Sequence, residues 1–570
     1  MMKRILIINF LAILLLIPVS AQTGQQDLNR EVTLYNPYKP SLSPAKKRSF
    51  LPDMNDTTRI RPDFKYDIAI KPFLPEYNIS PIKAASLLPD PLPKLYKSYI
   101  SLGLGNYITP LAEISITNER SKKGALGFYA RHFSTNGKVK LQNESKAFAG
   151  YMDNDASLYG RKFFRYNFLE GSVDYNQKTR YAYGYDTIVA GYEPENKDIK
   201  LDYNNIGADI SFASLTLDSA KFSYDFDANY DFFFNTGDLY QHNAGLAGTM
   251  ATLYKGFYAG SDMELDFFIP SATIHDNIKY KVSVSPFVKK STSQWNFKAG
   301  LQLLLDRNMN DKPDFHLYPD VRFGFSVVPE YVSFFAGLNG KLEVNEPLSI
   351  IEYNPFIVND GSLYTLTNTD HALIVSAGLN GNTGIGGNYL VSASYSMIDS
   401  MLFFSNYIFP SFILSPEMGN HFIPLYDDGE LLNIHGEITG MISDKITYKG
   451  AANFYNYTLS NYDYAWNKPG WDGKIGIKYN LRDKIIAGLD ITALGKRNLL
   501  ATRVNPLFGN TLEQVEEPVH VNFNLSAEYR YTKILSFWIK LNNIAFNRYY
   551  EWAYYPSQRF IGLVGFTYSL

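Results

Sequence analysis

Apolar and polar residues alternate strictly along residues 519–531, VHVNFNLSAEYRY. The odd positions carry Val, Phe, Leu, Ala and Tyr, whereas the even positions carry His, Asn, Ser, Glu and Arg. Side chains on a β-strand point alternately to its two faces, so the segment predicts a strand with one apolar and one polar face. A strand that spans a membrane needs about 9–11 residues, whereas soluble strands with this pattern usually have about 4–8. The length therefore favours a membrane-spanning strand whose odd residues face lipid.

The same alternation recurs through the C-terminal part of the chain. It predicts further strands near 446–454, 474–481, 485–493, 535–542 and 559–570. Short turns are expected at Ser443-Asp444, Arg482-Asp483 and Thr532-Lys533, and long links near 458–472, 496–517 and 546–558. Short turns on one side and long loops on the other are typical of a bacterial outer-membrane barrel, with the short turns in the periplasm. A closed barrel also satisfies every backbone group of strands that cross a membrane.

The spacing of these strands gives an estimate of their number. Counting the strand that must precede the Ser443-Asp444 turn, residues 430–570 hold seven predicted strands in 141 residues. At about 20 residues per strand, residues 96–570 would hold about 24 strands. Longer links such as 345–370 leave room for fewer, so 22 strands are equally expected. The number should be even, as in other single-chain bacterial barrels. We therefore predict an all-β fold, a transmembrane antiparallel β-barrel of 20 to 24 strands over residues 96–570.

The N-terminal residues have a different character. Residues 1–21 combine Lys3 and Arg4 with an apolar stretch and a small-residue site ending at Ala21, which predicts a secretory signal peptide cleaved after Ala21. Residues 22–95 hold eleven of the 28 prolines, a density that opposes regular helix and sheet. We expect this segment to be a Pro-rich periplasmic linker or a partial strap, and the protein to reside in the bacterial outer membrane.

Composition narrows the possible functions. The chain has 44 Tyr and 39 Phe, only 19% charged residues and a formal net charge of −2. This charge does not suggest nucleic-acid binding. The absence of Cys excludes disulfides, thiolate metal sites and a Cys nucleophile.

Residues 541–570, LNNIAFNRYYEWAYYPSQRFIGLVGFTYSL, resemble the last two strands of TonB-dependent receptors. The resemblance rests on an Asn-rich strand end, the aromatic RYYE segment and a glycine-containing strand that ends in an aromatic pattern. It implies a barrel of 22 strands, and we adopt that number. Family members carry a globular plug before the barrel, whereas the 74 Pro-rich residues 22–95 do not resemble one, and Leu570 stands where Phe is common. Glu31-Val32-Thr33-Leu34 loosely matches the segment that binds TonB, so TonB remains an uncertain partner.

Candidate chemistry is sparse along the chain. Asp306, Asn308 and Asn310 have the spacing of a calcium loop, but Asp311 and Leu317 replace the required Gly and Glu, so a solvated extracellular loop is the expected reading. We expect His132 and His520 to join hydrogen-bond networks in the lumen. No motif of a metal site, nucleophile or phosphate-binding loop occurs, so we predict no catalytic, cofactor or metal residues and no enzyme. The eight histidines are His132, His242, His275, His316, His371, His421, His435 and His520.

Charged residues on the predicted strands are expected to pair across the lumen or to set its selectivity. Arg131 lies on such a strand, and six others fall on polar faces that should line the interior. The aromatic residues in 462–471 and 548–556 are expected to form an interface girdle, with sugar stacking as the alternative. The six interior residues are Lys474, Lys478, Asp490, Glu528, Arg530 and Lys540.

Three functions remain open at this stage. The first is a relative of TonB-dependent receptors that takes part in solute uptake or passage. The second is a structural barrel that scaffolds an outer-membrane assembly or secretion complex with periplasmic or membrane protein partners. An enzyme carried by a barrel comes third. A wide barrel without a plug would leak, so the N-terminal region, inward-folded loops or a partner must close it.

Overall fold

The computed structural model describes most of the chain from Lys97 to Leu570. The predicted signal peptide and the whole Pro-rich segment 22–95, including the Glu31–Leu34 match, lie outside the described residues. The described ranges are 97–118, 123–141, 144–184, 195–215, 222–237, 239–271, 277–307, 312–358, 365–384, 386–407, 421–505 and 509–570. Among them, no helix has the length and apolar composition needed to cross a membrane.

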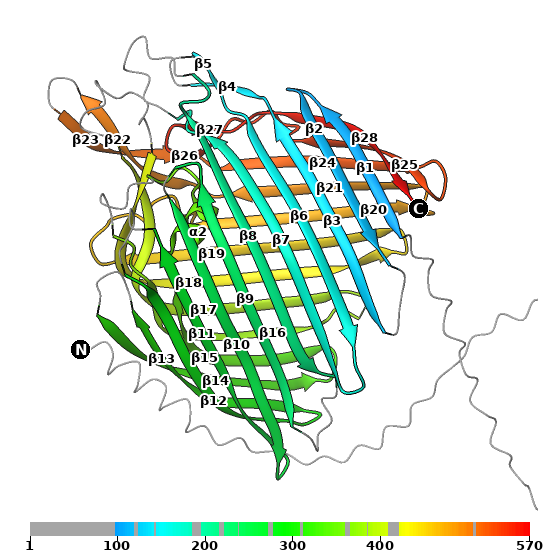
Figure 1. Ribbon diagram of the computed structural model, residues 1–570, viewed down its shortest axis with the longest axis vertical. Coiled ribbons are helices and arrows are strands. Elements are labelled where there is room, and N and C mark those ends of the chain that lie inside the picture. The colour runs from blue at the N-terminus through cyan, green and yellow to red at the C-terminus, as the bar shows by residue number, and fades with distance from the viewer. Residues whose placement is uncertain are drawn as a thin grey trace, which may run out of the picture. The chain divides into compact units, whose positions relative to one another are not determined.

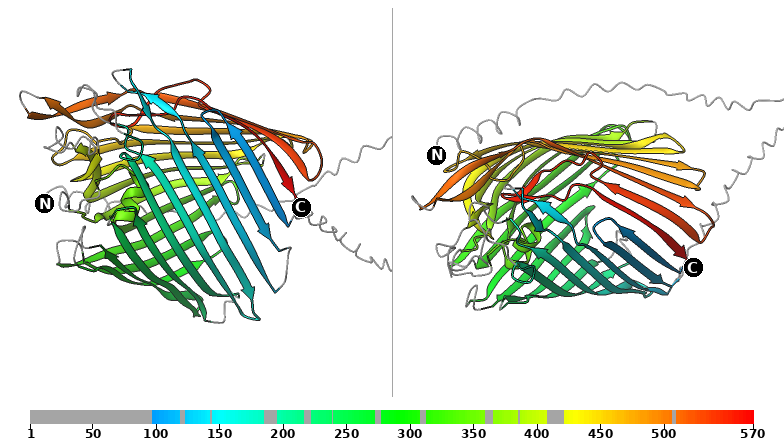
Figure 2. Two further views of the ribbon diagram at one scale, coloured as in Figure 1. Left: turned by 45° about the horizontal axis from the view of Figure 1, so that its top comes forward. Right: turned by 90° about the horizontal axis from the view of Figure 1, so that it is seen from above.

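The described residues form one closed antiparallel barrel of 22 strands, seen obliquely in Figures 1 and 2. This confirms the predicted fold class and the choice of 22 strands. The barrel strands are β1 Ser98–Gly105, β2 Thr109–Thr117, β3 Gly124–Thr135, β6 Tyr151–Phe163, β7 Asn167–Tyr181, β8 Lys200–Ser214, β9 Ser223–Asn235, β10 Tyr240–Tyr254, β11 Phe257–Pro270, β12 Lys279–Ser291, β13 Trp295–Arg307, β14 Pro313–Val328, β15 Val332–Glu343, β16 Thr369–Asn382, β17 Asn388–Tyr407, β18 His421–Ser443, β19 Ile446–Leu459, β20 Trp471–Leu481, β21 Ile485–Leu494, β24 His520–Arg530, β25 Leu535–Asn542 and β28 Ile561–Ser569.

The barrel closes where its first and last strands meet. β1 pairs with β28 in a register that runs from Tyr99 opposite Ser569 to Gly105 opposite Leu563. The backbone N–H of Lys97 donates to the carbonyl oxygen of Leu570 at 2.6 Å, so both ends of the barrel chain lie at one rim. Closure removes the free edges that an open sheet would present.

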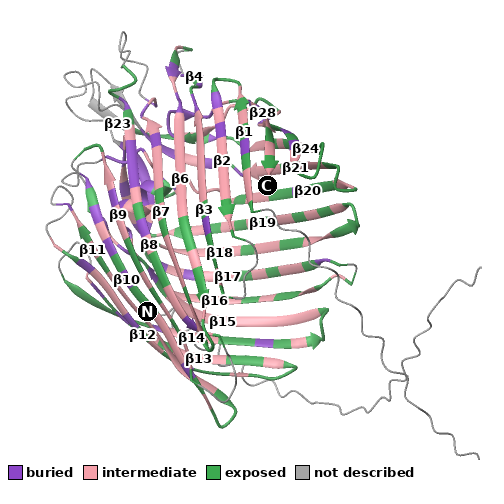
Figure 3. Ribbon diagram, turned by 45° about the vertical axis from the view of Figure 1, so that its right-hand side comes forward, coloured by how far each residue is buried: buried purple, intermediate pink, exposed green. Residues whose placement is uncertain are grey.

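Alternation along the strands places apolar side chains on the outer surface. In β24, Phe523, Leu525 and Tyr529 are 37–48% exposed, although they belong to a folded sheet. Large exposed apolar residues occur on every barrel strand except β15. Such a surface would be unfavourable in water. This is the surface that a lipid-facing barrel requires. Buried residues gather instead toward one end of the barrel (Figure 3).

The two rims of the barrel differ as predicted. One rim carries short turns, and those around Asp444, Asp483 and Lys533 join β18 to β19, β20 to β21 and β24 to β25. The other rim carries long links that contain additional elements. These are β4 Lys138–Lys140, β5 Lys146–Phe148, α2 Pro347–Tyr353, β22 Arg497–Asn505, β23 Gly509–Glu517, β26 Tyr550–Trp552 and β27 Tyr555–Pro556. The link predicted at 496–517 is thus the β22–β23 hairpin, which the sequence pattern did not reveal.

Candidate functional site: the lumen and its mouth

The six predicted interior charges lie on β20, β21, β24 and β25. Strand register places all of them on the same face of the sheet as Asn522 of β24. Asn522 lines a cavity together with residues of α2, so its side chain points into the barrel. Residues directly opposite each other in a strand pair share a face. Asn524 is opposite Asp490, Ser526 is opposite Lys540, and the ladder continues to β20. The expectation for this group is confirmed: Lys474, Lys478, Asp490, Glu528, Arg530 and Lys540 face the lumen.

Arg131 and His132 lie next to each other on β3, and the structure gives both defined partners. The Arg131 guanidinium lies 3.4 Å from the carboxylates of both Glu113 and Asp155 on the flanking strands. His132 Nδ1 lies 2.6 Å from Asn154 Oδ1. The predicted place of His132 in the lumen is wrong, because it lies opposite Ala112, which lies opposite the outward-facing Leu102. These contacts are the ordinary pairing of polar side chains across neighbouring strands.

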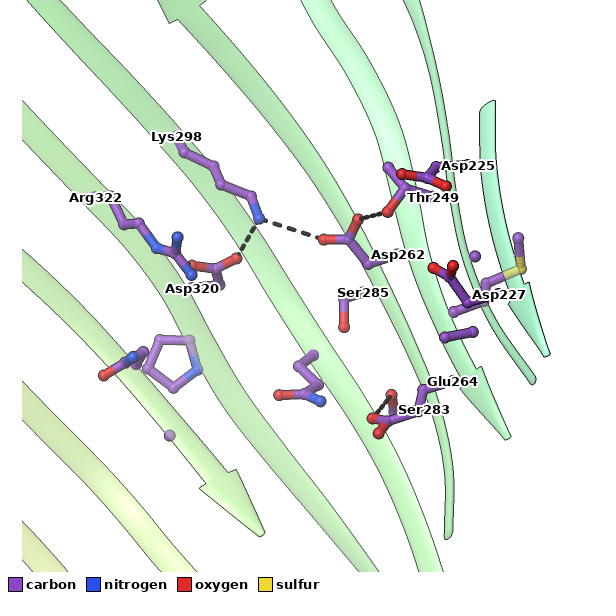
Figure 4. A pocket seen from close by; sticks show the side chains of 17 residues that line it. Asp225, Asp227, Thr249, Asp262, Glu264, Ser283, Ser285, Lys298, Asp320 and Arg322 are labelled. Atoms are coloured by element: carbon purple, nitrogen blue, oxygen red, sulfur yellow. Dashed lines mark hydrogen bonds and ion pairs between the residues drawn. The ribbon is translucent and has the colours of Figure 1, made fainter. Parts of the chain in front are cut away.

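A cavity of about 360 Å³ opens in the lumen wall formed by strands β9 to β15 (Figure 4). The Lys298 ammonium bridges Asp320 at 2.6 Å and Asp262 at 3.4 Å, and Thr249 Oγ1 donates to Asp262 at 2.8 Å. Asp225, on β9, lines the same cavity. The wall is therefore strongly polar and suits water and hydrophilic solutes.

The mouth at the long-link rim is filled by apolar side chains, which we call the mouth cluster. Strands on well-separated parts of the ring contribute Tyr203 and Phe233 from β8 and β9, and Phe404 and Phe422 from β17 and β18. β17 is nine strands from β8 around the ring of 22. Links complete the cluster between these walls. Its main link residues are Ile350, Ile351, Phe356, Leu499, Trp552 and Tyr555.

Burial of polar groups fixes α2 in the mouth. Glu346, the N-cap of α2, is 7% exposed and accepts hydrogen bonds from the amides of Gln241 and Asn243 on β10. The Lys279 ammonium donates to the carbonyl oxygen of Asn345 at 3.3 Å. Burial raises the pKa of Glu346 to about 7, while the Asn243 amide and the Lys279 charge act in the opposite direction. A buried carboxyl without such donors would be strongly unfavourable, so these contacts specify where the helix docks.

The β26–β27 hairpin is held by a second polar anchor. The Arg497 guanidinium donates to the carbonyl oxygens of Tyr550 and Glu551 at 2.5 and 3.2 Å. The Glu517 carboxylate accepts from the backbone N–H of Tyr550 at 3.0 Å. Both anchor residues come from the β22–β23 hairpin, so one link holds another across the mouth.

The expected aromatic girdle needs correction. Trp552, Tyr554 and Tyr555 of segment 548–556 are at most 9% exposed and pack into the mouth cluster, so they cannot contact lipid. Trp466 of segment 462–471 is likewise buried, although Trp471 is 40% exposed. An aromatic segment in a link looks the same in sequence whether it turns outward or inward, and only packing decides between them.

Asp306, the first residue of the segment with calcium-loop spacing, is not part of a solvated loop as expected. Asp306 is 2% exposed, and its carboxylate accepts hydrogen bonds from His316 Nε2 at 2.9 Å and Asn368 Nδ2 at 2.8 Å. Asn308 and Asn310 lie outside the described residues. Within the described ranges, no group of three or more His, Asp or Glu is placed to hold a metal ion.

His520 also departs from its expected role. Its ring stacks on Tyr549 with centroids 4.1 Å apart and planes 2° apart. Its buried Nδ1 has no hydrogen-bond partner among the described residues. His520 therefore packs against the link 543–560 instead of joining a lumen network, because β24 begins at the mouth.

Comparison with known proteins identifies the fold. No family model matches the chain, and no curated protein matches its sequence. Among solved structures, the FrpB iron transporter from Neisseria meningitidis aligns with a TM-score of 0.61 and 11% identity, over 84% of this chain and 82% of that one. The copper transporter OprC aligns with a TM-score of 0.58 and 12% identity, over 84% and 81%. The siderophore receptor PiuA from Acinetobacter baumannii aligns with 0.58 and 11%, over 84% and 82%.

These likenesses, together with the closed 22-strand ring, define the class of the barrel. The chain has the outer-membrane barrel fold of TonB-dependent receptors, as its C-terminal residues indicated.

Proposed function

We propose that the protein takes part in the passage of hydrophilic solutes across the outer membrane, with the mouth cluster as its gate. One observation carries the proposal. The apolar barrier of the mouth is completed by α2 and the β26–β27 hairpin, which belong to links and not to the barrel wall. Links can move while the 22 strands keep all their backbone hydrogen bonds.

The polarity of the two parts supports this assignment. The lumen wall exposes paired charges such as Lys298 with Asp320, which suit a wet pathway. The mouth presents buried aromatic and aliphatic side chains, which exclude water. An apolar constriction above a polar lumen is an arrangement that blocks solutes until the constriction opens.

Bilayer conductance of the purified full chain tests the proposal. Ile350 is 1% exposed in the cluster, so Ile350→Asp places a charge among apolar side chains and should displace α2. We expect low conductance for the wild type and a rise of several-fold for Ile350→Asp. Glu352→Gln, on the exposed part of the same helix, is the matched control and should leave conductance unchanged.

An unchanged low conductance in Ile350→Asp, with the barrel still folded, would contradict a gated pathway. If a stable partner also copurified with this non-conducting barrel, the alternative function would be favoured, namely a scaffold of an outer-membrane assembly. Heat-modified migration on gels reports whether the barrel has folded and separates loss of folding from loss of gating.

A further inference from the structure

A second cavity, of about 470 Å³, lies between the mouth cluster and the barrel wall. Its walls come from β6, β7, α2, β24 and the link 543–560, so it forms only when these distant segments meet. We call it the tyrosine pocket, after Tyr151, Tyr353 and Tyr549, which line it. Small-molecule sites usually have volumes of roughly 300–1,000 Å³, and this cavity falls within that range.

Several polar side chains that line the pocket have no protein partner. Asn542, Glu551 and Arg559 make no side-chain hydrogen bond or ion pair with the described residues, and Asn522 Oδ1 is shielded from solvent without a partner. Together they offer amide donors and acceptors, a carboxylate and a guanidinium. A shielded oxygen such as Asn522 Oδ1 is costly unless water or a ligand bonds to it, whereas Glu551 and Arg559 are exposed to the pocket. The pocket is thus equipped to bind a ligand with many hydroxyl groups.

Flat aromatic rings border these polar groups. Tyr353 is 49% exposed and meets Trp552 edge to face with centroids 5.8 Å apart. Its ring also stacks on Phe404 at 5.6 Å, and Lys468 Nζ lies 5.0 Å from its centre, so a ligand can use only the ring surface that these neighbours leave open. Tyr549 has one ring face covered by His520, and the Arg180 guanidinium lies 5.3 Å from the ring centre of Tyr151. A pyranose ring presents C–H groups on its faces and hydroxyls at its edge. The aromatic rings of the pocket are complementary to the C–H faces of such a ring, and the amide and charged side chains are complementary to its hydroxyls.

Charge balance sets the class of sugar. Lys178 lies 3.5 Å from Glu352, and Arg180 lies 2.7 Å from Asp153, so neither cation needs an anionic ligand. The remaining two charges, on Glu551 and Arg559, are opposite and sum to zero. A carboxylated ligand would find no net positive charge here.

We propose that the tyrosine pocket binds a neutral oligosaccharide. The proposal rests on the proposed function, because it names the solute class that would occupy the pathway next to its gate. The ligand rings stack on Tyr353 and Tyr151, and its hydroxyls bond to Asn522, Asn542 and Glu551.

Isothermal titration calorimetry on the full chain in detergent tests the assignment. The probes are three neutral hexasaccharides, maltohexaose, xylohexaose and mannohexaose, and the acidic hexagalacturonate. We expect at least one neutral probe to bind with a Kd below about 1 mM, the weak end of specific recognition. The double variant Asn522→Leu/Asn542→Leu and the single variant Tyr353→Ala should each weaken binding at least tenfold. Ser285→Ala, in the lumen cavity of Figure 4, is the control and should bind like the wild type.

Three results would overturn the proposal: no neutral probe binds, hexagalacturonate binds tighter than every neutral probe, or the pocket variants bind as well as the wild type. Conductance of Ile350→Asp is measured in parallel. A pathway that opens in this variant while all sugars fail to bind would refute the substrate class and leave the proposed gate intact. If Ile350→Asp shows no rise in conductance while the barrel binds sugar, the proposed gate is refuted and the proposed sugar site stands.

Discussion

At the scale of single residues, the face on which a side chain lies decides what it meets. Asn524 and Leu525 are neighbours on β24, yet their register partners Asp490 and Leu489 belong to opposite surfaces of the barrel. Leu525 is 40% exposed on the outer face, whereas Asn524 Oδ1 accepts a hydrogen bond from the backbone N–H of Asn543 at 3.0 Å. One step along the strand therefore changes lipid contact into lumen contact.

Leu525→Arg should destabilise the barrel by about 2–4 kcal/mol, because Leu525 lies near the middle of β24 and an Arg there would enter the lipid core. The matched change Asn524→Arg keeps its charge in the lumen opposite Asp490 and should cost about 1 kcal/mol for the lost hydrogen bond. Unfolding titrations of the barrel in lipid vesicles give both values. Equal costs at the two positions would show that the face assignment is wrong.

The Glu346 carboxyl should make docking of α2 depend on pH. Its pKa is about 7 when buried, against an ordinary value of 4.5, so the docked helix keeps a proton that the undocked one releases. Docking is therefore most stable below about pH 4.5 and loses this stabilisation as pH rises through 7. We expect opening events in bilayer recordings to be more frequent at pH 8.5 than at pH 5.5.

Glu346→Gln keeps an uncharged group of similar shape and should remove this pH dependence. Glu352→Gln, at an exposed carboxylate on the same helix, should retain it. A pH dependence that persists in Glu346→Gln would assign the effect to another group.

At the scale of elements, the links carry the features that distinguish this barrel. The short turns repeat one geometry, whereas the long links contain α2 and the β22–β23 and β26–β27 hairpins. Arg497 on β22 bonds to the backbone of β26, and Glu346 at the start of α2 bonds to β10. Each link thus depends on an element far away in sequence.

The orientation of the elements predicts which links are surface-accessible. An epitope tag inserted between Asn505 and Gly509, where β22 ends and β23 begins, should be labelled by antibody on intact cells. The same tag inserted at Thr532-Lys533, in the short turn before β25, should be labelled only after the outer membrane is permeabilised. Labelling of the second site on intact cells would invert the topology.

At the scale of the whole molecule, closure of the ring depends on the pairing of β1 with β28, whose residues are separated by most of the chain. Ser101 lies opposite Thr567, and their hydroxyl oxygens are 3.0 Å apart. The pair Ser101→Cys/Thr567→Cys should form an intramolecular disulfide, because the two hydroxyl oxygens that the sulfur atoms would replace are already in contact.

The natural chain has no Cys, so any disulfide that forms in a double variant must join the two introduced cysteines. The control pair Ser101→Cys/Phe566→Cys places the thiols on opposite faces and should not cross-link. Gel mobility under non-reducing conditions distinguishes the two. Cross-linking of the control pair alone would mean that the register is shifted by one residue.

The strand pattern and the C-terminal resemblance were sufficient for the barrel, its strand number and the lumen-facing charges. They were insufficient for the candidate site. The segment RYYEWAYYP at 548–556 indicated a girdle, yet Trp552 and Tyr555 pack beside Phe422 inside the mouth. The segment that begins at Asp306 was expected to be a solvated loop, yet the fold brings Asn368 and His316 to the Asp306 carboxylate.

The sequence alone determined the properties that repeat locally: alternation fixed which face of each strand is apolar, and spacing fixed turns and links. These follow from a two-residue period, which any stretch of β24 displays without reference to the rest of the chain. Only the tertiary structure decided the mouth cluster and the tyrosine pocket. Tyr151, Tyr353 and Asn522 come from three remote segments that meet when the ring closes and its links fold inward. Contacts between segments without a shared periodicity depend on packing, and packing exists only in the folded barrel.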